Sequence, residues 1–258
     1  MRASRSFLQF PIDPAAIYES GALPFFYTLQ PLEKGEMKEI KEYLELYALI
    51  SMEKQDKFER LIGEHAMELD FAAGEIRFSG GRSVPFQVLG TESGNTLTWL
   101  WAWSDEQPDI PLHLLTSAYQ LKDWGEKHEV HDFCSPSVDL NRADGQMISL
   151  IASEVCKASC YYRDPYEGGA IYFLLFDKGI DNQPSFNLRG MSRKLSELIS
   201  LYDFNHRNAL FSYFRMKGLS PVENGSAITC ELGSGEQLSA EFDDSGRLVS
   251  LNGEMIIS

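Results

Sequence analysis

The chain has 258 residues, of which 43% are hydrophobic and 24% are charged, so it can bury a sizeable core and is not disordered throughout. Its 23 basic and 38 acidic residues give a net charge of −15. Binding to nucleic-acid phosphates requires a basic surface, so we expect no nucleic-acid partner. No apolar run reaches the roughly 18 residues of a membrane span, and the first residues lack a signal-peptide apolar core. We therefore expect a cytoplasmic protein without a membrane partner.

The first part of the chain predicts one long helix and then a set of strands. Residues 1–35 contain four prolines and two apolar clusters, a pattern typical of an extended N-terminal arm. Over 36–64 the apolar residues follow helical spacing, which predicts an amphipathic helix that is either continuous or interrupted near 51–54. From 67 to 103 the spacing changes to two, and Gly-containing loops separate four strands, which predicts an antiparallel meander.

The remainder of the chain alternates helices and strands. Helical spacing recurs at 111–127 and 144–158, and strands are predicted at about 159–163 and 169–177. After a Gly- and Pro-containing stretch at 178–190, the pattern predicts two helices and three strands: 191–203, 205–217, 226–232, 237–242 and 247–256. We predict an α+β fold, with an antiparallel sheet that carries helices on one face and a smaller C-terminal part of helices and β-meander. The expected units are 1–35, 36–182 and 183–258.

Three of the four tryptophans lie within five residues of one another. Trp99, Trp101 and Trp103 are two residues apart, so on a strand their side chains leave the same face. Leu100 and Ala102 occupy the other face, which predicts that this strand lies at the centre of the sheet. The tryptophan face either packs into the core or lines a concave ligand pocket. In the second case, aromatic residues of later strands would form the opposite wall: Tyr161, Tyr162, Tyr172 and Phe173.

One polar cluster combines residue types that bind metals or perform nucleophilic chemistry: His128, His131, Asp132 and Cys134. Its spacing matches no standard zinc module, and Cys156 and Cys160, which would complete a site, also fit a helix end as small core residues. Cys134 and a histidine would form a nucleophile–base pair, but acidic surroundings raise the pKa of a thiol. We expect no metal and no cofactor, and we expect all four cysteines, including Cys230, to be reduced.

The sequence contains no recognisable catalytic motif. We find no hydrolase nucleophile elbow, phosphate-binding loop, dinucleotide-binding fingerprint or zinc-peptidase motif. Glu92 and Glu167 fall near predicted strand ends, where functional sites often collect, but hairpin turns account for both positions. We therefore assign no catalytic residue from the sequence.

Two neighbouring segments carry a resemblance to a known family. They are 86–91, which reads Phe-Gln-Val-Leu-Gly-Thr, and 98–103, which reads Thr-Trp-Leu-Trp-Ala-Trp. The pair resembles a bacterial family known only as a domain of unknown function, which combines a Gln-x-Leu-Gly-Thr/Ser strand with a Thr-Trp-x-Trp-Ala-Trp/Tyr strand. The resemblance covers about 36–178 and implies a shared fold there. It implies no activity, cofactor or catalytic residue.

Acidic residues are concentrated in the stretch that follows the tryptophan strand, where Lys122 and Lys127 are the only two lysines. Its seven carboxylates are Asp105, Glu106, Asp109, Asp123, Glu126, Glu129 and Asp132. Solubility is the simplest account of the charge, and electrostatic steering toward a basic protein is the more specific one.

Two functional hypotheses follow from these observations. The first is a non-enzymatic, cytoplasmic interaction module whose acidic stretch contacts a partner protein, in its specific form an immunity or antitoxin-like protein that neutralises a basic toxin. The second is a small-molecule-binding or enzymatic domain with an aromatic pocket at the tryptophan strand, formed by Trp99, Trp101, Trp103, Tyr161 and Tyr172.

Overall fold

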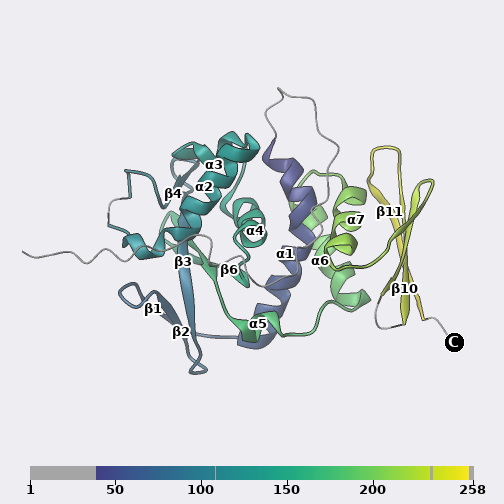
Figure 1. Cartoon of the computed structure of the whole chain (residues 1–258), viewed down its shortest axis with the longest axis horizontal. Helices are drawn as coiled ribbons and strands as arrows, with labels where there is room; N and C mark the ends of the chain where they lie inside the picture. The colour runs from purple at the N-terminus through teal and green to yellow at the C-terminus, as the bar shows by residue number, and fades with distance from the viewer. Residues whose placement is uncertain (1–38, 108, 233–234, 256–258) are drawn as a thin grey trace, which may run out of the picture. The chain divides into compact units, whose positions relative to one another are not determined.

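The computed structural model describes residues 39–107, 109–232 and 235–255, and the predicted arm at 1–35 lies outside them. A large antiparallel sheet comes first and a small one follows (Figure 1). The large sheet consists of β1 (Met67–Asp70), β2 (Glu75–Phe78), β3 (Ser83–Ser93), β4 (Thr98–Trp101), β5 (Ser137–Asp139), β6 (Cys160–Tyr166) and β7 (Gly169–Leu175). The small sheet consists of β8 (Val222–Asn224), β9 (Ala227–Leu232), β10 (Glu236–Phe242) and β11 (Leu248–Met255).

Helices precede, interrupt and follow the large sheet. They are α1 (Ile40–Ile62), the 3-10 turn η2 (Leu112–Leu114), α2 (Thr116–His128), α3 (His131–Cys134), α4 (Gly145–Val155), α5 (Lys178–Asp181), α6 (Leu188–Leu201) and α7 (His206–Met216). The predicted α+β class is confirmed, with a curled antiparallel sheet and its helices followed by C-terminal helices and a four-stranded meander. In the described part, no helix is both long enough and apolar enough to cross a bilayer.

Strand β3 organises the large sheet because it pairs with three other strands. Ser83–Pro85 pair with β2, Gly90–Ser93 pair with β4, and β7 pairs along the opposite edge. The register between β3 and β7 shifts between Val88 and Gly90, and such a bulge bends a strand and increases its twist. The centre of the sheet is therefore β3 and not the predicted tryptophan strand. β4 has only four residues, because the chain turns away after Trp101.

Gly90 explains why the two segments 86–91 and 98–103 belong together. A Cβ atom at this position would lie 2.5 Å from the Trp99 ring and 2.4 Å from the Leu100 carbonyl oxygen. These distances are far below van der Waals contact, so only glycine lets the indole pack over the strand. The two segments therefore form one packing unit at the middle of the large sheet.

Helix α1 runs without a break through the stretch at 51–54, where we considered an interruption. Ser51 and Glu53 disturb the apolar pattern there, yet both are buried. The hydroxyl of Ser51 donates to the Leu150 carbonyl of α4 at 2.6 Å. Polar side chains on this part of α1 are therefore satisfied by neighbouring helices, and α1 lies between α4 and α7 (Figure 1).

The C-terminal part shares a hydrophobic core with α1. Leu49 of α1 belongs to the same buried cluster as Met191 of α6, Leu210 of α7 and Ile228 of β9. The predicted helices and the last three strands are present, and the additional strand β8 pairs with β9. The sequence missed β8 because its three residues are all exposed and show no alternation.

Candidate functional site

Protein atoms enclose most of the tryptophan cluster. Trp99 and Trp101 are 0% exposed, and their rings meet edge to face at 5.4 Å. Trp103 follows β4 in a turn, where its ring stacks on that of Trp101 at 6.5 Å. The Trp101 Nε1 group donates to the Asp132 carbonyl at 3.0 Å, whereas Trp99 Nε1 has no partner among the described residues. The two indoles of β4 thus pack in the core, and ligand binding on this face stays a prediction.

Two of the four aromatic residues expected to face the tryptophans do so. The Tyr172 ring lies 5.3 Å from that of Trp99 and 6.4 Å from that of Tyr161. Tyr162 and Phe173 belong to a second hydrophobic cluster on the other side of the sheet. This division follows from the alternation of side chains along a strand.

An ion pair between a half-buried carboxylate and an exposed arginine stands beside Trp99. Glu92 of β3 lies opposite Trp99 in the ladder, and its Oε1 atom accepts from Arg163 Nη2 at 3.0 Å. Arg163 Nε also donates to the Tyr172 hydroxyl at 3.0 Å, while the Gly145 amide donates to Glu92 Oε2 at 3.3 Å. Burial, together with the nearby Glu92 carboxylate, raises the pKa of Tyr172. The cluster therefore joins β3, β6, β7 and α4.

The polar network continues from this ion pair toward α6. Asp144 caps α4 by accepting from the Met147 amide at 2.7 Å, and it also accepts from the Tyr202 hydroxyl at 2.9 Å. Sequence reasoning missed Arg163 and Tyr202 because no spacing rule connects residues so far apart along the chain. Glu167, the other carboxylate singled out, lies exposed in the turn between β6 and β7.

The histidines and the cysteine of the predicted metal or thiol cluster have separate surroundings. The His128 ring stacks on Trp124 at 4.2 Å, and its Nδ1 atom hydrogen-bonds the Trp124 carbonyl at 2.7 Å. His131 is exposed, and burial, together with Glu126, raises the pKa of the Cys134 thiol. All four cysteines are free. Among the residues that the structure describes, no three His, Cys, Asp or Glu side chains gather as a metal ion requires.

The acidic stretch divides into six exposed carboxylates and one buried carboxylate. Asp132 is only 3% exposed, and its Oδ1 atom forms an ion pair with Arg142 Nε at 2.7 Å. The other six are exposed and form no ion pair or side-chain hydrogen bond within the described ranges: Asp105, Glu106, Asp109, Asp123, Glu126 and Glu129. We call these six residues, together with the exposed Leu112 and Tyr119, the acidic face.

Helix α2 provides the ordered part of the acidic face. Its inward side packs through Ala118 and Leu121, which are fully buried. Tyr119, Asp123 and Glu126 follow the spacing i, i+4, i+7, which places them on one side of the helix. Tyr119 is 44% exposed, and Leu112 on the preceding η2 turn is 81% exposed. An exposed aromatic ring and an exposed aliphatic side chain thus belong to the same stretch of the chain as the unpaired carboxylates.

These observations describe an α+β domain built on a curled sheet, with an exposed acidic face beside it. A model of a family of unknown function, DUF6882, matches residues 41–178, and the chain belongs to this family. The matched range contains the whole large sheet and ends at the start of α5, so α6, α7 and the small sheet follow it. No curated protein matches the chain, and no solved structure does.

Proposed function

We propose that this protein is a non-enzymatic interaction module that acts in the cytoplasm by binding a basic protein partner through the acidic face. In its specific form, the proposal is an immunity or antitoxin-like protein whose partner is a basic toxin. The observation that carries the proposal is the set of six exposed carboxylates without ion pairs in the same stretch of the chain as the exposed Leu112 and Tyr119.

Elsewhere in the described part, some exposed carboxylates have a cation beside them, whereas others, such as Glu64 and Glu68, form no ion pair. Glu223 pairs with Arg207 at 2.6 Å, and Asp203 pairs with Arg247. These six exposed carboxylates belong to one stretch of the chain that contains only two lysines, Lys122 and Lys127, and a basic partner would complement this excess of negative charge. The apolar component also favours a protein partner, because exposed tyrosines are frequent binding hot spots and polar residues commonly form the rim around them.

A capture experiment with matched variants tests this proposal. The full chain, immobilised at low salt, is exposed to extract of its native host, and retained proteins are identified by mass spectrometry. The test variant is Asp123→Lys/Glu126→Lys, and the control is Glu64→Lys/Glu68→Lys, which changes the net charge equally at two exposed positions outside the acidic face. Both variants are first checked for a wild-type circular dichroism spectrum and melting temperature.

We expect one basic protein that is retained by the wild type and by the control and is lost from the test variant. The captured protein is then purified and titrated against all three chains, so that a direct dissociation constant replaces retention from an extract. Equal affinity for the test variant and the control would contradict the proposal, as would the absence of any retained basic protein.

A further inference from the structure

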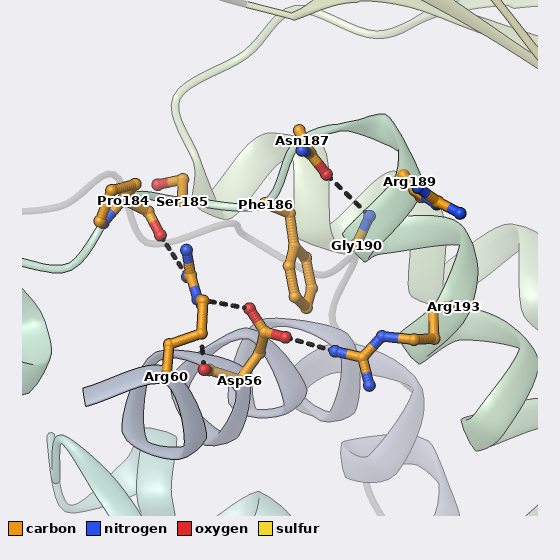
Figure 2. A pocket seen from close by; sticks show the side chains of 9 residues that line it. All are labelled: Asp56, Arg60, Pro184, Ser185, Phe186, Asn187, Arg189, Gly190 and Arg193. Atoms are coloured by element: carbon orange, nitrogen blue, oxygen red, sulfur yellow. Dashed lines mark hydrogen bonds and ion pairs between the residues drawn. The ribbon is translucent and has the colours of Figure 1, made fainter. Parts of the chain in front are cut away.

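A surface pocket of about 430 Å³ lies between the C-terminal half of α1 and the start of α6, far along the chain from the acidic face (Figure 2). Its volume falls within the range of small-molecule sites, which is about 300–1,000 Å³. Three arginines line it, Arg60 from α1 and Arg189 and Arg193 from α6. The chain has a net charge of −15, yet three arginines make the surface around this pocket positive.

One buried carboxylate organises two of these guanidinium groups. Asp56 is 7% exposed, and its Oδ2 atom pairs with Arg60 Nε at 3.0 Å. Its Oδ1 atom accepts from Arg193 Nη2, so one guanidinium group comes from the helix of Asp56 itself and the other comes from α6 (Figure 2). Arg60 Nη2 also donates to the Pro184 carbonyl at 2.6 Å. A single negative charge thus holds two positive charges in place, and one positive charge remains uncompensated.

The third arginine adds a further uncompensated charge at the rim. Arg189 is exposed, and none of its guanidinium donors has a partner in the described part of the chain. It stands in the first turn of α6, where Asn187 Oδ1 accepts from the Gly190 amide at 2.8 Å. The N-terminus of a helix carries a partial positive charge and backbone amides without helical acceptors. The arginines and this helix end therefore favour the same sign of ligand charge.

The positions of the hydrogen-bond donors favour a phosphate group over a carboxylate as the ligand. A carboxylate is satisfied by one bidentate guanidinium, whereas a tetrahedral phosphate dianion offers acceptors in several directions and suits donors from two helices. Phe186 also lines the pocket, and its ring is half-buried, so part of the wall is apolar. We propose that this pocket binds a small molecule with a phosphate group, which Arg60 and Arg193 hold while Arg189 adds positive charge at the rim and the apolar part of the ligand contacts Phe186.

Isothermal titration with defined probes tests the proposal on the full chain. The probes are inorganic phosphate and phenyl phosphate, each at constant ionic strength, with sodium chloride and phenol as reference titrants. The test variant is Arg189→Gln/Arg193→Gln. The matched control is Lys178→Gln/Lys127→Gln, which removes two exposed positive charges outside the pocket lining.

We expect saturable one-site binding of both phosphates and none of phenol, with phenyl phosphate the tighter of the two. The test variant should raise the dissociation constant by about tenfold or more, because it loses charged hydrogen bonds to the phosphate. The control should bind like the wild type. Urea unfolding of each variant shows whether the fold is kept, and in the wild type the phosphates should raise the midpoint. Absence of saturable binding to the wild type would overturn the proposal, and so would equal affinity of a folded test variant and the wild type.

Discussion

Carboxylates occupy opposite environments in the acidic face and in the contact between α1 and α7. In the contact, the Glu53 carboxylate is buried and receives Lys217 Nζ at 2.8 Å, the Tyr213 hydroxyl at 2.6 Å and the Phe186 amide at 3.2 Å. In the acidic face, Asp123 and Glu126 are exposed and have no cationic partner in the described ranges. Carboxylates therefore stabilise the fold in the contact between α1 and α7, whereas in the acidic face they are available to a partner.

The strongest test of this contrast removes a buried carboxylate. Glu53→Ala should lower the free energy of unfolding by about 3 kcal/mol, because Lys217 and Tyr213 lose their shared acceptor in a buried setting. Urea unfolding followed by circular dichroism measures the change. Glu64→Ala, at an exposed position, is the control and should stay within about 0.5 kcal/mol of the wild type. A wild-type stability for Glu53→Ala would show that the buried network is not structural.

A smaller effect is expected from acid. Burial raises the pKa of Glu53, but its hydrogen bonds from Lys217 and Tyr213 outweigh burial, and the net pKa lies below the ordinary 4.5. Burial likewise raises the pKa of Glu154, while Lys54 and Lys157 bring it below 4.5. A carboxyl group with a lowered native pKa stabilises the fold fully above its unfolded pKa, and this contribution is lost as pH falls through the native pKa.

We therefore expect the free energy of unfolding to decline as pH falls below about 4.5. Glu53→Gln should show a shallower decline between pH 5 and the acid limit of folding, because it lacks a carboxylate whose pKa is lowered in the native state. Urea unfolding at a series of pH values gives the slope, with Glu64→Gln as the control that keeps the wild-type slope. An unchanged slope for Glu53→Gln would contradict the structural role of this carboxylate.

The smallest effect on stability belongs to the acidic face. Asp123→Asn/Glu126→Gln should change the free energy of unfolding by no more than about 0.5 kcal/mol, because exposed carboxylates without partners contribute little to folding. Asp132→Asn provides the contrast within the same stretch, since it breaks the ion pair of a buried carboxylate with Arg142 and should cost about 1–3 kcal/mol. Thermal and urea unfolding compare the two. Equal losses in the free energy of unfolding would mean that the carboxylates of the acidic face also stabilise the fold.

The elements of the fold could be predicted from local patterns, whereas the contacts between them could not. Helical spacing indicated α1, and alternating apolar and acidic residues indicated β1, because amphipathic periodicity is a local property of the sequence. The turn after Trp101, which makes β4 short, carries no such periodicity. The position of Gly90 against Trp99 depends on strand pairing, so its reason became visible only in the structure.

The acidic face and the arginine pocket likewise depend on contacts that the sequence could not predict. The carboxylates of the acidic face were recognisable from composition alone, but the burial of Asp132 was not, because it depends on Arg142 lying beside it. The arginine pocket joins Arg60 to Arg193 through Asp56, and Arg193 lies more than a hundred positions from the other two residues. Charge density along the chain therefore indicates an exposed face, while a pocket formed by distant segments requires the folded arrangement.

The central claim, that the acidic face attracts a basic protein, is tested most directly by the association rate constant with the purified partner at different ionic strengths. Screening shortens the Debye length from about 30 Å at 0.01 M to about 8 Å at 0.15 M salt, so an electrostatically steered association slows steeply over this range. We predict a steep decline for the wild type and for Glu64→Lys/Glu68→Lys, and a slow, nearly salt-independent rate for Asp123→Lys/Glu126→Lys. A salt-independent rate for the wild type, or the same decline for Asp123→Lys/Glu126→Lys, would contradict the claim.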